Sequence, residues 1–137
     1  MITTNGKSNF QIVDEVFTKL LEQGGRCADH NGECRYERIE DDGTISHCAV
    51  GWLIPEATPR MVSFDGGVIG LFSTFNGGLG PNEEWMRENT TLLVSIQGIH
   101  DTTDPDRLNV VLEDPRFLAG IGGEIPDSLK QWMENLQ

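Results

Sequence analysis

Apolar residues recur with a helical period near the start of the chain. Between Phe10 and Leu21 they follow i, i+3, i+4 spacing, and charged or polar residues fill the other positions. Ser8 or Asn9 can cap the beginning of such a helix, and Gly24 can supply the left-handed residue that ends it. The pattern therefore predicts an amphipathic helix over residues 9–23.

Weaker helical patterns follow in the second half of the chain. Pro81 suits the first turn of a helix, residues 90–100 carry an apolar face, and a short helix is expected between Pro105 and Asp114. Residues 127–137 give the clearest pattern of this half, with Asp127 as a natural cap. Its apolar positions are Leu129, Trp132, Met133 and Leu136.

The centre of the chain has the pattern of a β-hairpin. Residues 34–39 alternate as a strand, the Asp-Asp-Gly sequence at 41–43 is a turn signal, and residues 44–46 can form the returning strand. Residues 48–55 then turn apolar, which indicates a short buried helix that ends before Pro55. We therefore expect an α+β fold, in which amphipathic N- and C-terminal helices pack a small antiparallel sheet containing the 34–45 hairpin.

The length of 137 residues predicts one domain, with residues 1–8 as a loosely attached lead. Residues 56–80 give no clear pattern: 68–75 suits either a strand or short helical turns. The start of the chain lacks the pattern of a signal peptide, and no apolar run reaches the length of a membrane span. We therefore expect a cytoplasmic protein without a membrane partner.

The balance of charges is strongly acidic, with 22 acids against 10 bases and a net charge of −12. Such a surface repels a phosphate backbone, which disfavours direct binding of nucleic acid. It also speeds encounter with a basic partner. The acids of the hairpin are the densest group, and Glu37, Glu40, Asp41 and Asp42 are the candidate contacts with a basic protein, although a solvated hairpin tip explains them equally well.

Cysteines and histidines gather in the same central stretch. Cys27, His30, Cys34 and His47 supply four ligands of the types that structural zinc prefers. Adjacent side chains on a strand face opposite ways, so at most one of His47 and Cys48 can join a tetrahedral site. We prefer the interpretation without zinc or another cofactor, in which Cys34 and Cys48 are buried, reduced side chains.

A nucleophilic thiol is the other chemistry that these residues allow. Cys48 precedes the short apolar helix, whose N-terminus would stabilise a thiolate. His47 or His100 could act as the base, with Asp101 orienting an imidazole. The apolar surroundings of Cys48 oppose this reading because burial raises the pKa of a thiol. For His100 and Asp101 the competing interpretation is a role at the C-terminus of a helix.

Several short motifs resemble those of a family of small, mostly uncharacterised proteins of tailed bacteriophages. The family pattern is a helix ending L-x-x-Q-G, then C-x-Y, then C-A-[IV]-G-x-L-I-P, then L-Q-x-x-H-D. The chain matches it within residues 16–56 and 92–101 and departs at Ile96, where the pattern has leucine. The matching positions are Gln23, Gly24, Cys34, Tyr36, Cys48 to Gly51, Leu53 to Pro55, Gln97, His100 and Asp101.

The resemblance implies a phage protein acting in the cytoplasm of an infected bacterium, but no particular activity. Combined with the charge, it favours an acidic binding protein that modulates or inhibits a host protein through a carboxylate-rich face. Such a target would have a basic surface and could belong to a nucleic-acid-handling or defence complex. The alternative is a cysteine- and histidine-dependent enzyme, or a small zinc-binding domain, built on residues 27–48.

Overall fold

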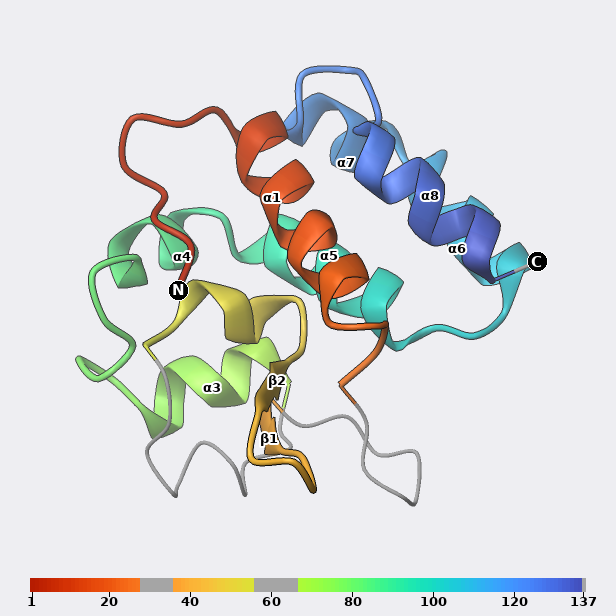
Figure 1. The fold of residues 1–137 in the computed structure, drawn as a ribbon. Helices are drawn as coiled ribbons and strands as arrows, with labels where there is room; N and C mark the ends of the chain where they lie inside the picture. The colour runs from red at the N-terminus through yellow and green to blue at the C-terminus, as the bar shows by residue number, and fades with distance from the viewer. Residues whose placement is uncertain (28–35, 56–66, 137) are drawn as a thin grey trace.

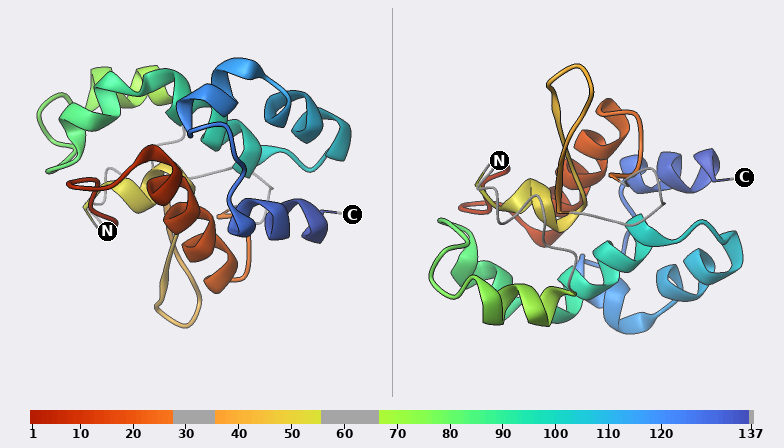
Figure 2. Two further views of the ribbon diagram at one scale, coloured as in Figure 1. Left: turned by 90° about the horizontal axis from the view of Figure 1, so that it is seen from above. Right: turned by 90° about the horizontal axis from the view of Figure 1, so that it is seen from below.

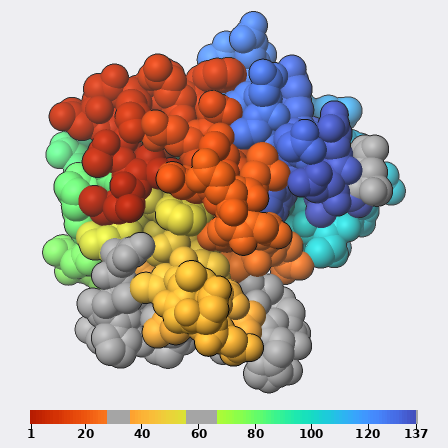
Figure 3. Space-filling model, viewed as in Figure 1, coloured from red at the N-terminus to blue at the C-terminus, as the bar shows by residue number. Residues whose placement is uncertain are grey.

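A computed structural model describes residues 1–27, 36–55 and 67–136 of the chain, which combines a helical body with one short hairpin (Figure 1). The hairpin extends away from the helices in both further views (Figure 2), and the space-filling view shows it at the lower edge of the molecule (Figure 3). The elements are α1 (Asn9–Glu22), β1 (Glu37–Ile39), β2 (Ile45–His47), the 3-10 helix η1 (Val50–Leu53), α3 (Val68–Thr74), α4 (Glu83–Glu88), α5 (Thr90–Asp101), α6 (Pro105–Leu112), α7 (Pro115–Gly120) and α8 (Asp127–Asn135).

Both ends of α1 are closed by local hydrogen bonds. Ser8 and Gln11 form a capping box, in which each side chain accepts from the backbone N–H of the other residue. At the other end Gly24 and Gly25 adopt positive φ angles, and their N–H groups donate to the carbonyls of Leu21 and Leu20. This is a Schellman motif, and it confirms the predicted helix and its glycine stop.

The hairpin pairs β1 with β2 in antiparallel register, with Glu37 opposite His47. Its turn is the predicted one, because Gly43 takes a positive φ and donates its N–H to the Glu40 carbonyl. The predicted position of Cys34 lies outside the described residues. Helix η1 follows directly and ends before Pro55, as expected, but with 3-10 geometry.

One hydrophobic cluster runs through the helical body. Helix α1 packs mainly against α8, while α5 contacts α3, α4, α6, α7 and η1. Fully buried side chains from α1, η1, α4 and α5 meet in this cluster; they include Phe17, Leu53, Met86, Leu93 and Ile96. The predicted α+β class, with its small hairpin and its two terminal amphipathic helices, is confirmed.

The first residues of the chain are held more firmly than the sequence indicated. Ile2 is 6% exposed and donates its N–H to the Trp52 carbonyl. The buried Asn82 amide accepts from Thr4 through Oδ1 and donates through Nδ2 to the carbonyls of Ile2 and Leu53. A single side chain thus ties the start of the chain to η1 and α4, so the expectation of a loose lead is corrected.

Other differences concern short helices. Within the ambiguous residues 68–75, Val68–Thr74 form α3, and a helix that was not predicted, α7, begins at Pro115. Asp127 is the first residue of α8 and not its cap, which is Pro126. In the part of the chain that the structure describes, every helix is too short or too polar to cross a membrane.

Candidate functional site

The four hairpin acids do not share one exposed face. Glu37 is completely buried, and its Oε1 lies 3.7 Å from Nδ1 of the equally buried His47 on the opposite strand. The ring of His47 lies 4.3 Å from that of Trp52. Glu37 therefore cannot meet a partner at the surface, and its place among the contact residues is corrected.

The other hairpin acids lie near the turn. Glu40 is partly exposed and accepts a hydrogen bond from Ser46 Oγ at 2.6 Å. Asp41 and Asp42 are exposed. Hydrogen bonds from the hydroxyl and then the backbone N–H of Thr44 lower the pKa of Asp42, so this carboxylate stays charged and already has two donors.

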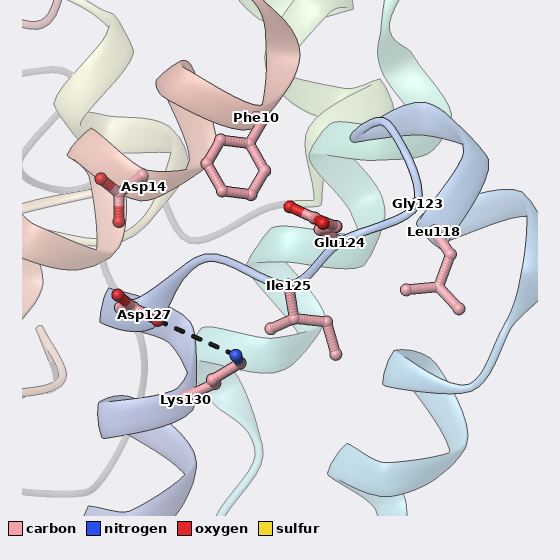
Figure 4. A pocket seen from close by; sticks show the side chains of 8 residues that line it. All are labelled: Phe10, Asp14, Leu118, Gly123, Glu124, Ile125, Asp127 and Lys130. Atoms are coloured by element: carbon pink, nitrogen blue, oxygen red, sulfur yellow. Dashed lines mark ion pairs between the residues drawn. The ribbon is translucent and has the colours of Figure 1, made fainter.

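A second group of acids surrounds a hollow that the sequence did not reveal. The hollow has a volume of about 700 Å³ and lies between α1 and the chain that leads from α7 into α8 (Figure 4). Phe10 and Asp14 from α1 face Glu124, Ile125 and Asp127 across it. We call this feature the acidic hollow.

The acidic hollow combines an apolar lining with an excess of negative charge. Phe10, Leu118 and Ile125 supply the apolar surface, and three carboxylates stand against one cation, Lys130. Lys130 Nζ lies 3.8 Å from Asp127 Oδ1, a long ion pair between exposed side chains. Such a hollow suits the alkyl stem and charged head of a lysine or arginine.

Ser128 fixes one wall of the acidic hollow. Its hydroxyl donates to Asp14 Oδ1 at 2.6 Å, and it lies 3.1 Å from the Asp14 carbonyl oxygen. This contact joins α1 to α8, two elements separated by more than a hundred positions in the sequence. The Asp14 carboxylate is thereby held in place, whereas Glu124 and Asp127 remain exposed.

A different constellation lies at the base of the hairpin. The backbone N–H of Cys27 donates to His100 Nε2 at 3.1 Å, so His100 carries its proton on Nδ1 and donates it to Asp101 Oδ1 at 2.8 Å. Asp101 thus orients the imidazole, as predicted. His100 lies in the last turn of α5, at the predicted end of a helix, but its imidazole is completely buried and stacks on Trp132.

The cysteine that contacts His100 is Cys27 and not Cys48, and it does so through its backbone N–H. Cys27 is 1% exposed, and its Sγ lies 3.5 Å from Ser46 Oγ, whose proton is donated to Glu40. Cys48 is a completely buried free thiol that accepts from the Gly51 N–H. The prediction that Cys48 is buried is therefore confirmed. His100 accepts its hydrogen bond from Cys27 and not from Cys48.

The proposed zinc ligands can be placed only in part. Cys27 contacts Ser46 and His47 faces Glu37, and the alternation of β2 directs these two contacts to opposite faces of the hairpin. His30 and Cys34 lie outside the described residues. Within residues 1–27, 36–55 and 67–136, no three histidine, cysteine or acidic side chains gather as metal ligands do.

Two glutamines of the motifs that resemble those of phage proteins, Gln23 and Gln97, connect elements of secondary structure. Gln23 accepts from the N–H of His47 and donates to its carbonyl, which joins the end of α1 to β2. Gln97 accepts from the Val50 N–H and donates to Asp101, which joins η1 to the end of α5. These contacts give the motif a structural reason, because each amide satisfies backbone groups between elements.

Comparisons of the chain with family models, with curated proteins and with solved structures find no match. The functional argument therefore rests on the geometry and charge of the molecule. No short motif marks the acidic hollow, because its acids come from Asp14 and from residues 124–127. The one sequence signal that points toward the acidic hollow is the excess of acidic over basic residues in the composition.

Proposed function

We propose that the protein is a non-catalytic binding protein that engages a basic protein through its acidic surface. The observation that carries the proposal is the acidic hollow, where exposed Glu124 and Asp127 flank apolar side chains on a chain of net charge −12. A lysine or arginine of the partner would place its stem on Phe10 and its charged head between the carboxylates. Charge complementarity of this kind chiefly accelerates association.

The sequence resemblance suggests where the partner is found. It implies a bacterial host protein that the chain modulates or inhibits during phage infection. A nucleic-acid-handling or defence protein is a suitable class, because its basic surface normally holds phosphates and carboxylates can occupy it instead. Asp41 and Asp42 of the hairpin are exposed acids on the same molecule and are the alternative contact, which the experiment below distinguishes from the acidic hollow.

The proposal is tested by capturing a host protein from bacterial lysate and measuring its association rate with the purified chain. The double variant Glu124→Gln/Asp127→Asn should associate about 3- to 30-fold more slowly, because each exposed charge contributes up to about 1 kcal/mol. High salt should slow the wild-type protein in the same way, since screening shortens the Debye length from about 8 Å at 0.15 M to about 3 Å at 1 M.

The control removes the same charge elsewhere. The variant Asp41→Asn/Asp42→Asn changes two exposed acids at the hairpin tip and should leave the association rate within about twofold of wild type if the acidic hollow is the contact. The reverse result would assign the contact to the hairpin. An association rate indifferent to salt and to both double variants would refute the proposal.

Thiol chemistry at Cys27 is the second candidate function, because the backbone of Cys27 contacts the imidazole of His100, which Asp101 holds on its other side. If it operates, a thiol reagent should modify Cys27 faster than the buried Cys48, and Asp101→Asn should slow that modification. Mass spectrometry of the native protein after timed exposure to iodoacetamide measures both rates. Equal, slow labelling of both thiols would leave the trio a purely structural role.

A further inference from the structure

A second cavity, of about 310 Å³, lies between the end of α1 and the last turn of α8. Its apolar lining comes from Leu21 and Leu136, and its polar lining from Arg26 and Asn135. Trp132 completes the wall and is only 4% exposed. We call this feature the Trp132 cavity; it is separate from the acidic hollow, with which it shares no lining residue.

Two side chains that line the Trp132 cavity each carry a buried hydrogen-bond donor without an acceptor among the residues that the structure describes. Within the described part of the chain, the indole N–H of Trp132 and the Nε–H of Arg26 are buried and make no hydrogen bond. Buried donors in folded proteins nearly always have a partner, and each exception needs an explanation. Two exceptions in one cavity indicate an acceptor that the chain itself does not supply.

Trp132 and Asn135 can each donate a hydrogen bond to a ligand in the Trp132 cavity. The ring of Trp132 stacks on His100 and forms a T-shaped pair with Phe17, and its indole N–H has no hydrogen-bond acceptor among the described residues. Asn135 accepts from Gln131 through its oxygen, so the amide group that it can offer a ligand is the NH₂. The cavity thus presents donors from three side chains beside apolar surface.

The donor set favours one class of ligand. A guanidinium offers parallel N–H groups that match a carboxylate in geometry and charge. A phosphate monoester also accepts hydrogen bonds, but it carries nearly two negative charges and is opposed more strongly by a chain of net charge −12. The apolar walls beside Trp132 suit a flat apolar body attached to the acidic group.

We propose that the Trp132 cavity binds a small organic carboxylate, with the acid on Arg26 and the indole N–H and the apolar body against Leu21 and Leu136. This inference is independent of the function proposed for the acidic hollow. Binding there would also press on the ring that stacks against His100, next to Cys27.

The probe for the experiment is 2-naphthoate, and its matched uncharged control is 2-naphthylmethanol. The protein has three tryptophans, so amide NMR spectra contain three indole N–H signals, and Trp132→Phe identifies the relevant one by its loss. Titration with 2-naphthoate should shift that signal with a Kd on the order of 0.1–1 mM, while the alcohol should bind at least about tenfold more weakly.

Arg26→Gln should weaken binding of 2-naphthoate by about tenfold or more, because it removes the charge and the guanidinium but keeps a polar side chain. Arg107→Gln, at an exposed position on α6, is the matched control and should bind as wild type does. The rest of each spectrum reports that the variant is folded. A Trp132 signal unmoved by naphthoate, or an equal response to acid and alcohol or in the Arg26 variant, would overturn the proposal.

Discussion

Gly51 of η1 lies against the backbone of Tyr36, beside the hairpin, where there is room for a hydrogen atom but not for a side chain. A Cβ atom at this position would collide with the backbone oxygen of Tyr36 and crowd His47. That oxygen cannot easily retreat because it accepts the N–H of Cys48. Close packing is therefore the reason for a glycine here. Backbone conformation is not the reason, because the φ of Gly51 lies outside the left-handed region.

Gly51→Ala should lower the free energy of unfolding by about 1–3 kcal/mol, because the added methyl group forces a shift of backbone atoms. Gly98→Ala is the control, at an exposed helical position on α5 with open space around its Cβ. It should raise the free energy of unfolding by about 0.5–1 kcal/mol through the better helix propensity of alanine. Urea denaturation measures both changes, and a Gly51 variant as stable as wild type would contradict the packing argument.

At the scale of the elements, Glu83 organises the connection from α3 to α4. Its carboxylate accepts from the N–H groups of Leu79 at 2.9 Å and Gly77 at 3.1 Å, and it pairs with Arg87. Arg87 in turn donates to the Phe72 carbonyl. The hydrogen bond from Leu79, helped by those from Gly77 and Arg87, lowers the pKa of Glu83 below its ordinary value of 4.5.

Glu83→Gln should therefore destabilise the protein in a pH-dependent way. A carboxyl group whose pKa is lowered on folding contributes its full stabilisation above its unfolded-state value and loses it as the pH falls through the folded-state value. The difference in free energy of unfolding between wild type and variant should be largest at pH 7 and shrink below about pH 4. Urea midpoints measured at several pH values test this.

Glu84→Gln is the control for this experiment, since Glu84 is exposed in the same first turn of α4. It removes the same charge from the same helix end without removing the hydrogen bonds to Gly77 and Leu79. Its effect should be smaller than that of Glu83→Gln at pH 7. Equal effects of the two substitutions would show that helix-terminus charge, and not the loop contact, accounts for the stabilisation.

The whole molecule carries 22 acids and 10 bases, and this imbalance opposes the compact state through self-repulsion. Raising sodium chloride from about 0.01 M to 0.3 M should increase the free energy of unfolding, because the Debye length falls well below the size of the domain. Thermal unfolding at each salt concentration measures the change. Choline chloride at equal ionic strength should act alike, and a stability that falls with both salts would contradict the expectation.

Local patterns were sufficient for the elements that carry their own stop signals. The Ser8 cap and the glycine stop of α1, the Asp-Asp-Gly turn and the Asp-Pro start of α6 each depend on residues close together in the sequence, and each is confirmed. Helix α7 was missed because its six residues carry no full apolar period. Residues 68–75 were ambiguous for the same reason.

The candidate sites were decided by tertiary structure. Composition determined that the molecule is acidic, but the fold buried Glu37 and brought Asp14 to Glu124 and Asp127 across an interface between α1 and the approach to α8. In the same way, the fold brings His100 into contact with Cys27, which lies 73 positions earlier in the sequence. Sequence alone determined the helical periods, the turns and the charge. The periods and turns depend on neighbouring residues, and the net charge is the sum of the acidic and basic residues. Which carboxylates stay in water, and which cysteine contacts an imidazole, depend on packing between distant segments, which local patterns do not contain.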